Sequence, residues 1–174
     1  MRKILRNRLA LSTVITTLII LVVSVLLAGV VTYFAINVVS TRVQQESLTL
    51  SFTHVWVGPT GTTQAAVLIK NTGGRDVVIN AIQVRGIAGT FGTNVFYKVA
   101  STNPTPLAST SGLNATTTAT PITLASGSTI QVYITDPTSV SIQDVGTTVG
   151  ITVFTAQAMY YQETNVQAST VTLP

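Results

Sequence analysis

"NRLALSTVITTLIILVVSVLLAGVVTYFAIN", residues 7–37, contains a single charged side chain, that of Arg8, and the next charge along the chain is Arg42. The 33 positions from 9 to 41 are therefore uncharged, whereas about 20 apolar residues suffice to span a bilayer. A secretory signal has a shorter apolar core of roughly 7–15 residues, followed by a small-residue cleavage site. The stretch instead predicts one apolar helix over residues 11–46, which would form a rod of roughly 54 Å.

The charged residues are unevenly distributed along the chain. The formal net charge is +4, from nine basic and five acidic residues. Four of the bases (Arg2, Lys3, Arg6 and Arg8) lie near the N-terminus, and the other five bases are equal in number to the acids. A nucleic-acid-binding surface needs basic residues clustered on the folded domain. We therefore expect a basic leader over residues 1–10 and no nucleic-acid partner.

From Ser47 onward the sequence is typical of an all-β domain, which we place at residues 47–174. Short apolar–polar alternations rich in Val, Ile and Thr are separated by breaks that contain Gly or Pro. The seven predicted strand segments are 47–57, 63–70, 76–84, 93–100, 128–136, 148–161 and 165–174. This spacing is that of a sandwich. The expected fold class is α+β, with a long N-terminal apolar helix joined without a linker to an Ig-like or Greek-key sandwich.

Three local predictions follow from the pattern of the β region. Strict alternation over 47–57 places five side chains on one face: Leu48, Leu50, Phe52, His54 and Trp56. The sequence NTGG (71–74) predicts a hairpin connection in which glycine supplies a positive φ angle. Segment 101–121 has few bulky apolar residues and many Ser, Thr, Asn and Pro, which predicts a long exposed loop or a frayed edge.

The N-terminal pattern is shared with a known family. A basic leader, a small residue, Leu-Ser and an uninterrupted apolar helix are typical of prepilins, and RKILRNRLA (2–10) followed by LSTVITTLIILVV (11–23) resembles the class III signal peptide of archaeal type IV pilins. The resemblance implies that a membrane-embedded prepilin peptidase cuts between Ala10 and Leu11 on the cytoplasmic side, where the positive charges hold the leader. The apolar helix would then remain in the product. Many bacterial pilins carry a glutamate at the fifth mature position, which is Ile15 here and favours the archaeal branch.

The resemblance covers about 40 residues closely and is only architectural beyond them. It implies a structural subunit of an extracellular pilus, used for adhesion or surface attachment, that polymerises through its helix. The implied partners are other copies of the chain, the peptidase, a cytoplasmic assembly ATPase and a membrane platform protein, with the cell membrane holding the precursor. Two alternatives stay open: a single-pass membrane-anchored β domain that acts as a binding module, and an archaellin, the subunit of a motility filament.

Small residues form a candidate packing ridge on the helix. Ser24, Ala28 and Thr32 are spaced four apart, and small residues let helix backbones approach closely where lipid and protein are equally apolar. The alternative is that small residues are simply frequent in this chain.

Chemical motifs are scarce. The chain has no cysteine and no P-loop, GxGxxG, HExxH or GxSxG motif, so we expect neither an enzyme nor a cofactor. His54, the one histidine, is expected to pack in the core. Asp136 and Asp144 could share a Ca²⁺ ion, but DPTS (136–139) and QDVG (143–146) are more typical of turns.

Two surface features complete the sequence-based expectations. Met159, Tyr160 and Tyr161 are expected to serve in sheet packing or a subunit contact. Asn114 begins the N-glycosylation sequon NAT, and charged residues are only 8% of the chain. We therefore expect glycans at Asn114 and on Ser or Thr of 101–120, where they would hydrate the surface without ionisable groups.

Overall fold

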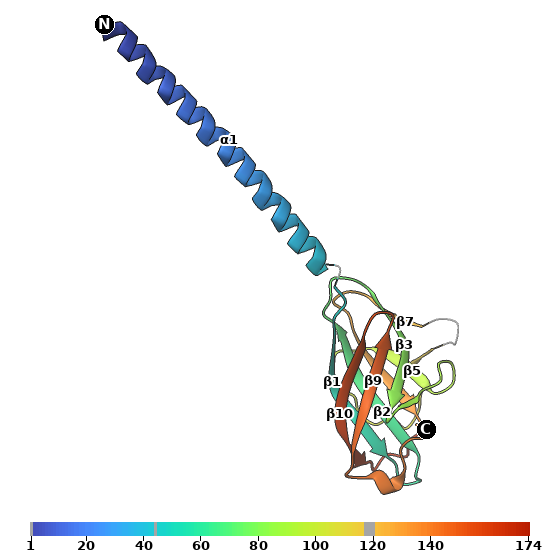
Figure 1. Cartoon of the computed structure of the whole chain (residues 1–174). Helices are drawn as coiled ribbons and strands as arrows, with labels where there is room; N and C mark the ends of the chain where they lie inside the picture. Colours follow the sequence, from blue (N-terminus) through green and yellow to red (C-terminus); the bar gives the residue numbers. More distant parts are fainter. Residues whose placement is uncertain (1, 44, 117–120) are drawn as a thin grey trace. The chain divides into compact units, whose positions relative to one another are not determined.

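The computed structural model describes residues 2–43, 45–116 and 121–174 (Figure 1). It divides into two compact units, a helix and a β head that begins at Gln44, and each is described by itself. This confirms the predicted α+β class, one long apolar helix followed by an all-β domain.

Helix α1 extends from Arg2 to Val43. It contains no proline and one glycine, Gly29, so nothing in it breaks the backbone ladder. The helix itself begins before residue 11, because the leader continues it, but the apolar span begins at Leu11, as predicted. The predicted end at residue 46 is too far along the chain, since the residues before the first strand bond to the head instead.

Two hydrogen-bonded contacts hold the first residues of the head. The Ser47 carbonyl accepts from the backbone N–H groups of Thr72 (2.9 Å) and Gly73 (3.0 Å), and the Glu46 carboxylate accepts from the Thr155 hydroxyl. The Ser47 carbonyl is committed to these partners in the head and is not part of a helical hydrogen-bond ladder.

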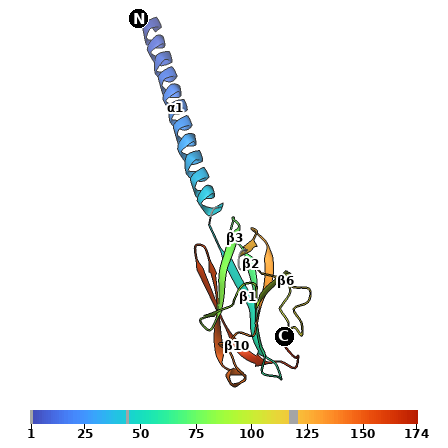
Figure 2. The same ribbon diagram turned by 90° about the vertical axis from the view of Figure 1, so that its right-hand side faces the viewer.

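The head is one curled sheet of ten strands (Figures 1 and 2). Its elements are β1 (Leu48–Val57), β2 (Thr63–Asn71), β3 (Val77–Val84), β4 (Ile87–Ala88), β5 (Val95–Val99), β6 (Asn114–Ala115), β7 (Ile122–Leu124), β8 (Thr129–Thr135), the 3₁₀ turn η1 (Ile142–Asp144), β9 (Thr148–Thr155) and β10 (Met159–Ala168). The strand order is β4-β3-β9-β10-β1-β2-β8-β5-β6, and β7 pairs with β3. The seven longer strands match the seven predicted segments in number, although some boundaries differ.

The sheet consists of two halves joined by a parallel pair. Strands β1 and β10 pair in parallel from Val55↔Val166 to Val57↔Ala168, whereas the other named pairs are antiparallel. We call β1-β2-β8-β5-β6 the A half and β4-β3-β9-β10 with β7 the B half. Both contribute to one apolar core, which makes the head sandwich-like. Its fully buried members include Val55, Val67, Ile69, Ile79, Ile82, Val132 and Ile151.

A bulge in β1 overturns the prediction of a single face over 47–57. Ser51 pairs with Leu68, but His54 pairs with Ala66, so β1 carries one extra residue between them, and Phe52 has φ +47°. The bulge reverses the alternation along the strand. Leu48, Leu50, Val55 and Val57 belong to the main core, whereas Trp56 belongs to a separate cluster on the outer face of the A half with Tyr133 and Leu173.

The NTGG connection is not a hairpin, contrary to prediction. Strand β2 pairs with β1 and β8, and β3 pairs with β4, β7 and β9, so the chain crosses here from one half of the sheet to the other. Gly73 does not have a positive φ angle. It is needed because a Cβ atom there would lie 2.6 Å from the Gln45 carbonyl oxygen and 2.7 Å from the Ser47 nitrogen.

The last two predicted strands also have different boundaries. The segment 148–161 breaks after Thr155, where a backbone hydrogen bond from Thr155 to Ala158 (2.9 Å) closes a turn before β10 begins. The predicted strand 165–174 covers only the end of β10, because the chain leaves the sheet after Ala168 and Leu173 packs against the outer face of the A half.

The segment predicted as an exposed loop lies partly on the A half. Leu107 and Leu113 pack on the Trp56–Tyr133 cluster, the Leu107 N–H donates to Gln64 (2.9 Å), and Gln131 donates to the Thr102 carbonyl. Part of the predicted loop, residues 117–120, lies outside the described residues. The described part of the segment is irregular apart from the two-residue edge strand β6, which agrees with the predicted loop or frayed edge, but it packs on the sheet rather than projecting freely.

Candidate functional site: the apolar helix

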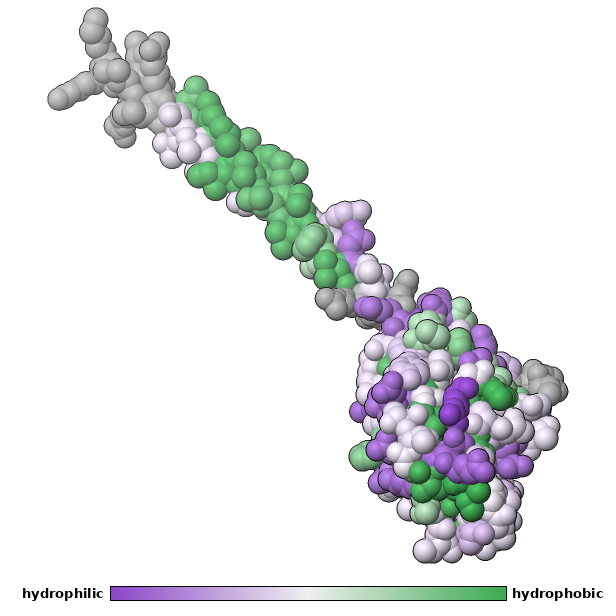
Figure 3. All heavy atoms as spheres, turned by 60° about the horizontal axis from the view of Figure 1, so that its bottom comes forward, coloured by the Kyte–Doolittle hydropathy of each residue, from purple (hydrophilic) through white to green (hydrophobic). Residues whose placement is uncertain are grey.

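The most unusual surface of the molecule is that of α1. Every side chain from Leu11 to Thr41 is exposed within the unit, including those of Leu18, Leu26 and Phe34. This stretch is long and apolar enough to cross a membrane, and Figure 3 shows apolar residues along its visible side. A helix that is apolar on all sides needs lipid or protein around it.

The predicted packing residues lie together on this surface. Ser24, Ala28 and Thr32 are exposed and follow one another at one-turn intervals along α1. The Ser24 hydroxyl donates to the Ile20 carbonyl (2.7 Å) and the Thr32 hydroxyl to the Ala28 carbonyl (2.7 Å). Their donors are thus satisfied within the helix, so the ridge can enter an apolar environment without an unmet hydrogen bond.

Other hydroxyl side chains of the helix behave in the same way. Thr16, Thr17 and Thr41 each donate to a backbone carbonyl three or four residues earlier, at 2.8–2.9 Å. The signal for this was present in the sequence, because Ser and Thr in helices commonly bond to the preceding turn.

The predicted cleavage residues, Ala10 and Leu11, lie inside α1, where the helix is continuous. Leu11 is exposed. Cleavage between them stays a prediction.

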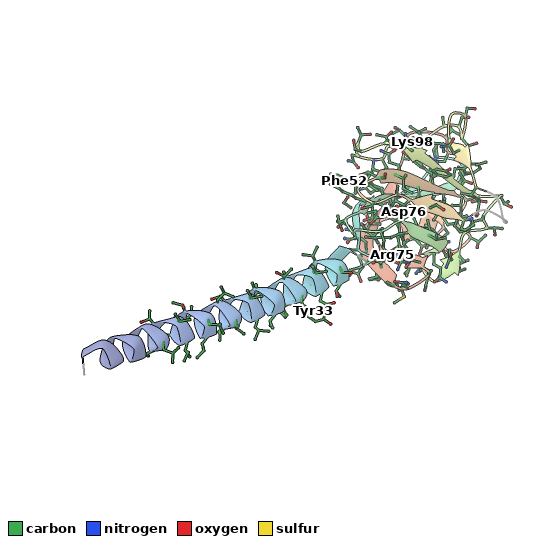
Figure 4. All side chains as sticks on the ribbon, turned by 90° about the horizontal axis from the view of Figure 1, so that it is seen from above. Tyr33, Phe52, Arg75, Asp76 and Lys98 are labelled. Atoms are coloured by element: carbon green, nitrogen blue, oxygen red, sulfur yellow. The ribbon has the colours of Figure 1, made fainter. Side chains whose placement is uncertain are left out.

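The exposed aromatic residues of the helix were not singled out from the sequence. Tyr33 is 72% exposed and Phe34 69% exposed, and Figure 4 shows the Tyr33 side chain projecting from the helix. Their position could have been noticed, since no other aromatic residue occurs between Leu11 and Asn37.

His54 is not the core histidine that was predicted. The bulge places it on the outer face of the A half, where its ring stacks on Trp56 (5.1 Å between ring centres) and its Nε2 atom lies 2.9 Å from Asn103 Oδ1. Lys98 lies nearby on the same half, 5.4 Å from the ring centre of Tyr133. Burial raises the pKa of the Tyr133 hydroxyl, which therefore stays protonated at neutral pH.

The two aspartates considered for calcium have separate roles. Asp144 accepts from Arg85 Nη1 (2.7 Å) and from the Ser141 backbone and hydroxyl (2.8 Å each). The Arg85 hydrogen bond, followed by the Ser141 bonds, lowers the pKa of Asp144 to about 2. Asp136 accepts from the Thr63 hydroxyl at 3.5 Å. Within the described part of the chain, no three acidic or histidine side chains form a group that could hold a metal ion.

The B half carries an uncovered apolar strip on β10. Met159 is 62% and Tyr161 57% exposed, whereas Tyr160 packs against the main core. The Tyr161 hydroxyl donates to Glu163 (3.0 Å), and this bond raises the pKa of Tyr161. Of the three residues predicted for packing or contact, one is thus half-buried against the core and two are exposed.

Asn114 is exposed, as predicted, but it belongs to the short strand β6 and pairs with Tyr97. The third residue of its sequon is not exposed. This residue, Thr116, is buried. Its hydroxyl donates to the Val95 carbonyl (2.6 Å) and accepts from the Gly92 N–H (3.0 Å).

Comparison with known proteins adds little to this picture. No protein-family profile matches the chain, and no curated protein matches it significantly. Among solved structures, a β-glucosidase from Listeria innocua in complex with glucose matches with a TM-score of 0.27 and 12% identity, over 73% of this chain and 16% of that one. The match spans less than a fifth of the length of that enzyme, and a similarity so low carries no argument.

Proposed function

We propose that this protein is a structural subunit of an extracellular filament of the type IV pilin kind, which polymerises through α1 and serves surface attachment. Its role is mechanical rather than catalytic. The resemblance of residues 2–23 to an archaeal prepilin leader supports the proposal, and so does the fully exposed apolar surface of α1.

The observation that carries the proposal is the length of the apolar surface. The span from Leu11 to Thr41 has 31 residues, which at 1.5 Å per residue is about 46 Å. The hydrocarbon core of a bilayer is about 30 Å thick. A tilt of about 50° would be needed to fit the whole span into lipid, which is more than the 0–40° found for membrane helices.

Lipid alone therefore leaves part of the helix uncovered, and a plain membrane anchor does not account for that part. Other copies of the same helix would cover it completely. Moving the helix into water would cost tens of kcal/mol at about 25 cal/mol per Å², so a subunit must pass from lipid directly into a bundle. One contact repeated by a rotation that does not close generates a helical filament.

The two hydroxyl groups of the small-residue ridge are compatible with a dry bundle. The span from Leu11 to Thr41 has no charged residue, and the hydroxyls of Ser24 and Thr32 are satisfied within the helix. A buried bundle therefore leaves neither an unpaired charge nor an unmet hydroxyl donor at these positions.

The test is microscopy of fibres sheared from cells that express the chain, with mass spectrometry of the fibres. We expect fibres composed of this chain, with Leu11 as the N-terminus. A chain that remains in the membrane fraction as a monomer, with no fibre containing it, would contradict the proposal.

Processing has its own control. Replacing Ala10 with a bulky residue should leave uncut precursor in the membrane and abolish fibres, whereas Ala10→Gly should be processed normally. Recovery of peptides from residues 1–10 in purified fibres would show that cleavage is not part of assembly.

A further inference from the structure

We propose that the helix sits in the membrane at one fixed depth, with Arg8 at the lipid headgroups of the cytoplasmic leaflet and Tyr33 at those of the opposite leaflet. The segment 37–41 then lies outside the lipid until assembly. The membrane part of this proposal needs only a membrane-inserted helix, and the assembly part rests on the proposed function.

The spacing along α1 fits the thickness of a bilayer. Arg8 and Tyr33 are 25 residues apart in a continuous helix, a rise of about 38 Å, and a bilayer with its headgroups measures about 40–45 Å. The 22 residues from 11 to 32 rise about 33 Å, close to the hydrocarbon thickness of about 30 Å.

The residue types change at the two ends of this segment. Residues 11–32 contain no charged, amide or aromatic side chain. Tyr33 and Phe34 follow at once, both strongly exposed, and Asn37 is the first amide after them. Tyrosine is enriched where the apolar core of a membrane meets water, because its ring is apolar and its hydroxyl polar.

Basic residues define the cytoplasmic end of the membrane-spanning segment. Arg2, Lys3, Arg6 and Arg8 precede the apolar span, and basic residues complement the anionic headgroups of the cytoplasmic leaflet. Arg42 lies 34 residues from Arg8, a rise of about 51 Å, so it would reach the opposite headgroups only at a tilt of about 30–40°, well above the average of about 20° for membrane helices. The aromatic pair therefore defines the outer boundary.

At this depth, which we call the membrane register of the helix, the last part of the span lies outside the lipid before assembly and among neighbouring helices after it. Val38 and Val39 are 45% and 61% exposed on α1, and they project beyond the lipid in the membrane-inserted chain. In a filament, neighbouring helices would cover them. Val22 is in lipid before assembly and in protein after it.

Cysteine labelling tests the register, because the natural chain contains no cysteine. Val22→Cys and Val38→Cys, each in the full-length chain, would be treated with a membrane-impermeant maleimide in intact cells and again after denaturation in detergent. In membranes we expect Val38→Cys to react at least tenfold faster than Val22→Cys, with equal reaction after denaturation. Protection of Val38→Cys in membranes, or labelling of Val22→Cys, would overturn the register.

Labelling of purified fibres tests the proposed filament separately from the depth of the helix in the membrane. There we expect both cysteines to be protected. If Val38→Cys is labelled in membranes and also in fibres, the register holds and the helix bundle proposed for the filament is wrong.

A second set of variants tests the role of Tyr33. In membranes, Ile36→Cys lies just beyond the aromatic pair and should be labelled in the natural background. Tyr33→Leu should slow this labelling several-fold, because the helix can sink deeper, and Tyr33→Trp should restore it. Equal labelling in all three backgrounds would show that Tyr33 does not set the depth.

Discussion

The ring of Tyr161 occupies the space above Gly150 on the neighbouring strand. A Cβ atom at position 150 would lie 2.3 Å from Cε2 and 2.5 Å from the hydroxyl oxygen of this tyrosine. Glycine in a strand is ordinarily a weakness, but here the aromatic ring covers it.

Gly150→Ala should therefore destabilise the head. We expect a loss smaller than the cost of about 1–3 kcal/mol for overpacking a core, because the exposed ring can swing away at the expense of its hydroxyl's hydrogen bond to Glu163. The measurement is the urea midpoint of the full-length chain in detergent. The control is the same substitution in a Tyr161→Ala background, where alanine should gain roughly 0.5–1 kcal/mol over glycine. An equal loss in both backgrounds would rule out the ring as the cause.

Asn71→Ala should have a larger effect. The Asn71 side chain is fully buried, donates to the carbonyls of Arg75 (2.8 Å) and Leu124 (3.0 Å), and accepts from the Gly73 N–H (3.0 Å). Removing it leaves the buried Leu124 carbonyl without this donor, which costs about 1–3 kcal/mol. The urea midpoint should fall accordingly. Thr72→Ala, on an exposed neighbour, is the matched control, and an equally large loss from it would contradict the role of Asn71.

The sequence predicted the local features of the fold but not those that depend on contacts distant in the chain. The long helix and the strand-rich head followed from local periodicity and composition, because each signal lies within one segment. The bulge at Phe52 could not be predicted, since a positive φ at phenylalanine has no sequence signature. The crossing after Asn71 could not be predicted either, because strand partners distant in the sequence decide it.

The candidate site was likewise predicted from the sequence only in part. The apolar span was visible in the sequence, and the helix confirms that its residues form one uninterrupted surface. The outer-face position of His54 was missed, because it depends on the bulge. Cleavage at Ala10, packing at Ser24, Ala28 and Thr32, and a glycan at Asn114 stay predictions.

Stability at low pH should depend on Asp144. Its pKa in the folded chain is about 2, below the ordinary value of about 4 for an unfolded chain. The unfolded state therefore binds more protons between these values, so stability from this group is present above about pH 4 and lost as the pH falls towards 2. Urea midpoints of the natural chain and Asp144→Asn, measured from pH 6 to pH 2, should converge across this window. A constant difference between them would contradict the pKa shift.

A charge in the middle of α1 should prevent assembly. Leu26 is exposed on the helix, and Leu26→Asp would place an unpaired carboxylate in the dry bundle of the proposed filament, at a cost of several kcal/mol per subunit. We expect no fibres, with a head that still unfolds at its usual urea midpoint. Leu26→Met is the matched control and should assemble. Normal fibres from Leu26→Asp would mean that the helix does not lie in a dry core.

The glycan prediction can be tested through the sequon's third residue. Thr116 is buried and bonds to Val95 and Gly92, so we expect an enzyme to modify Asn114 before this segment docks on the head. Asn114→Gln should lower the intact mass of the shed subunit by one glycan with little change in stability, because Asn114 is exposed. Thr116→Ser keeps both the sequon and the hydroxyl, so it should retain the glycan. Thr116→Val should lose the glycan and also destabilise the head, by about 1–3 kcal/mol for the broken hydrogen bonds. An intact mass for the natural chain that equals its sequence mass would show that Asn114 carries no glycan, and the hydration of a surface with so few charges would then need another source.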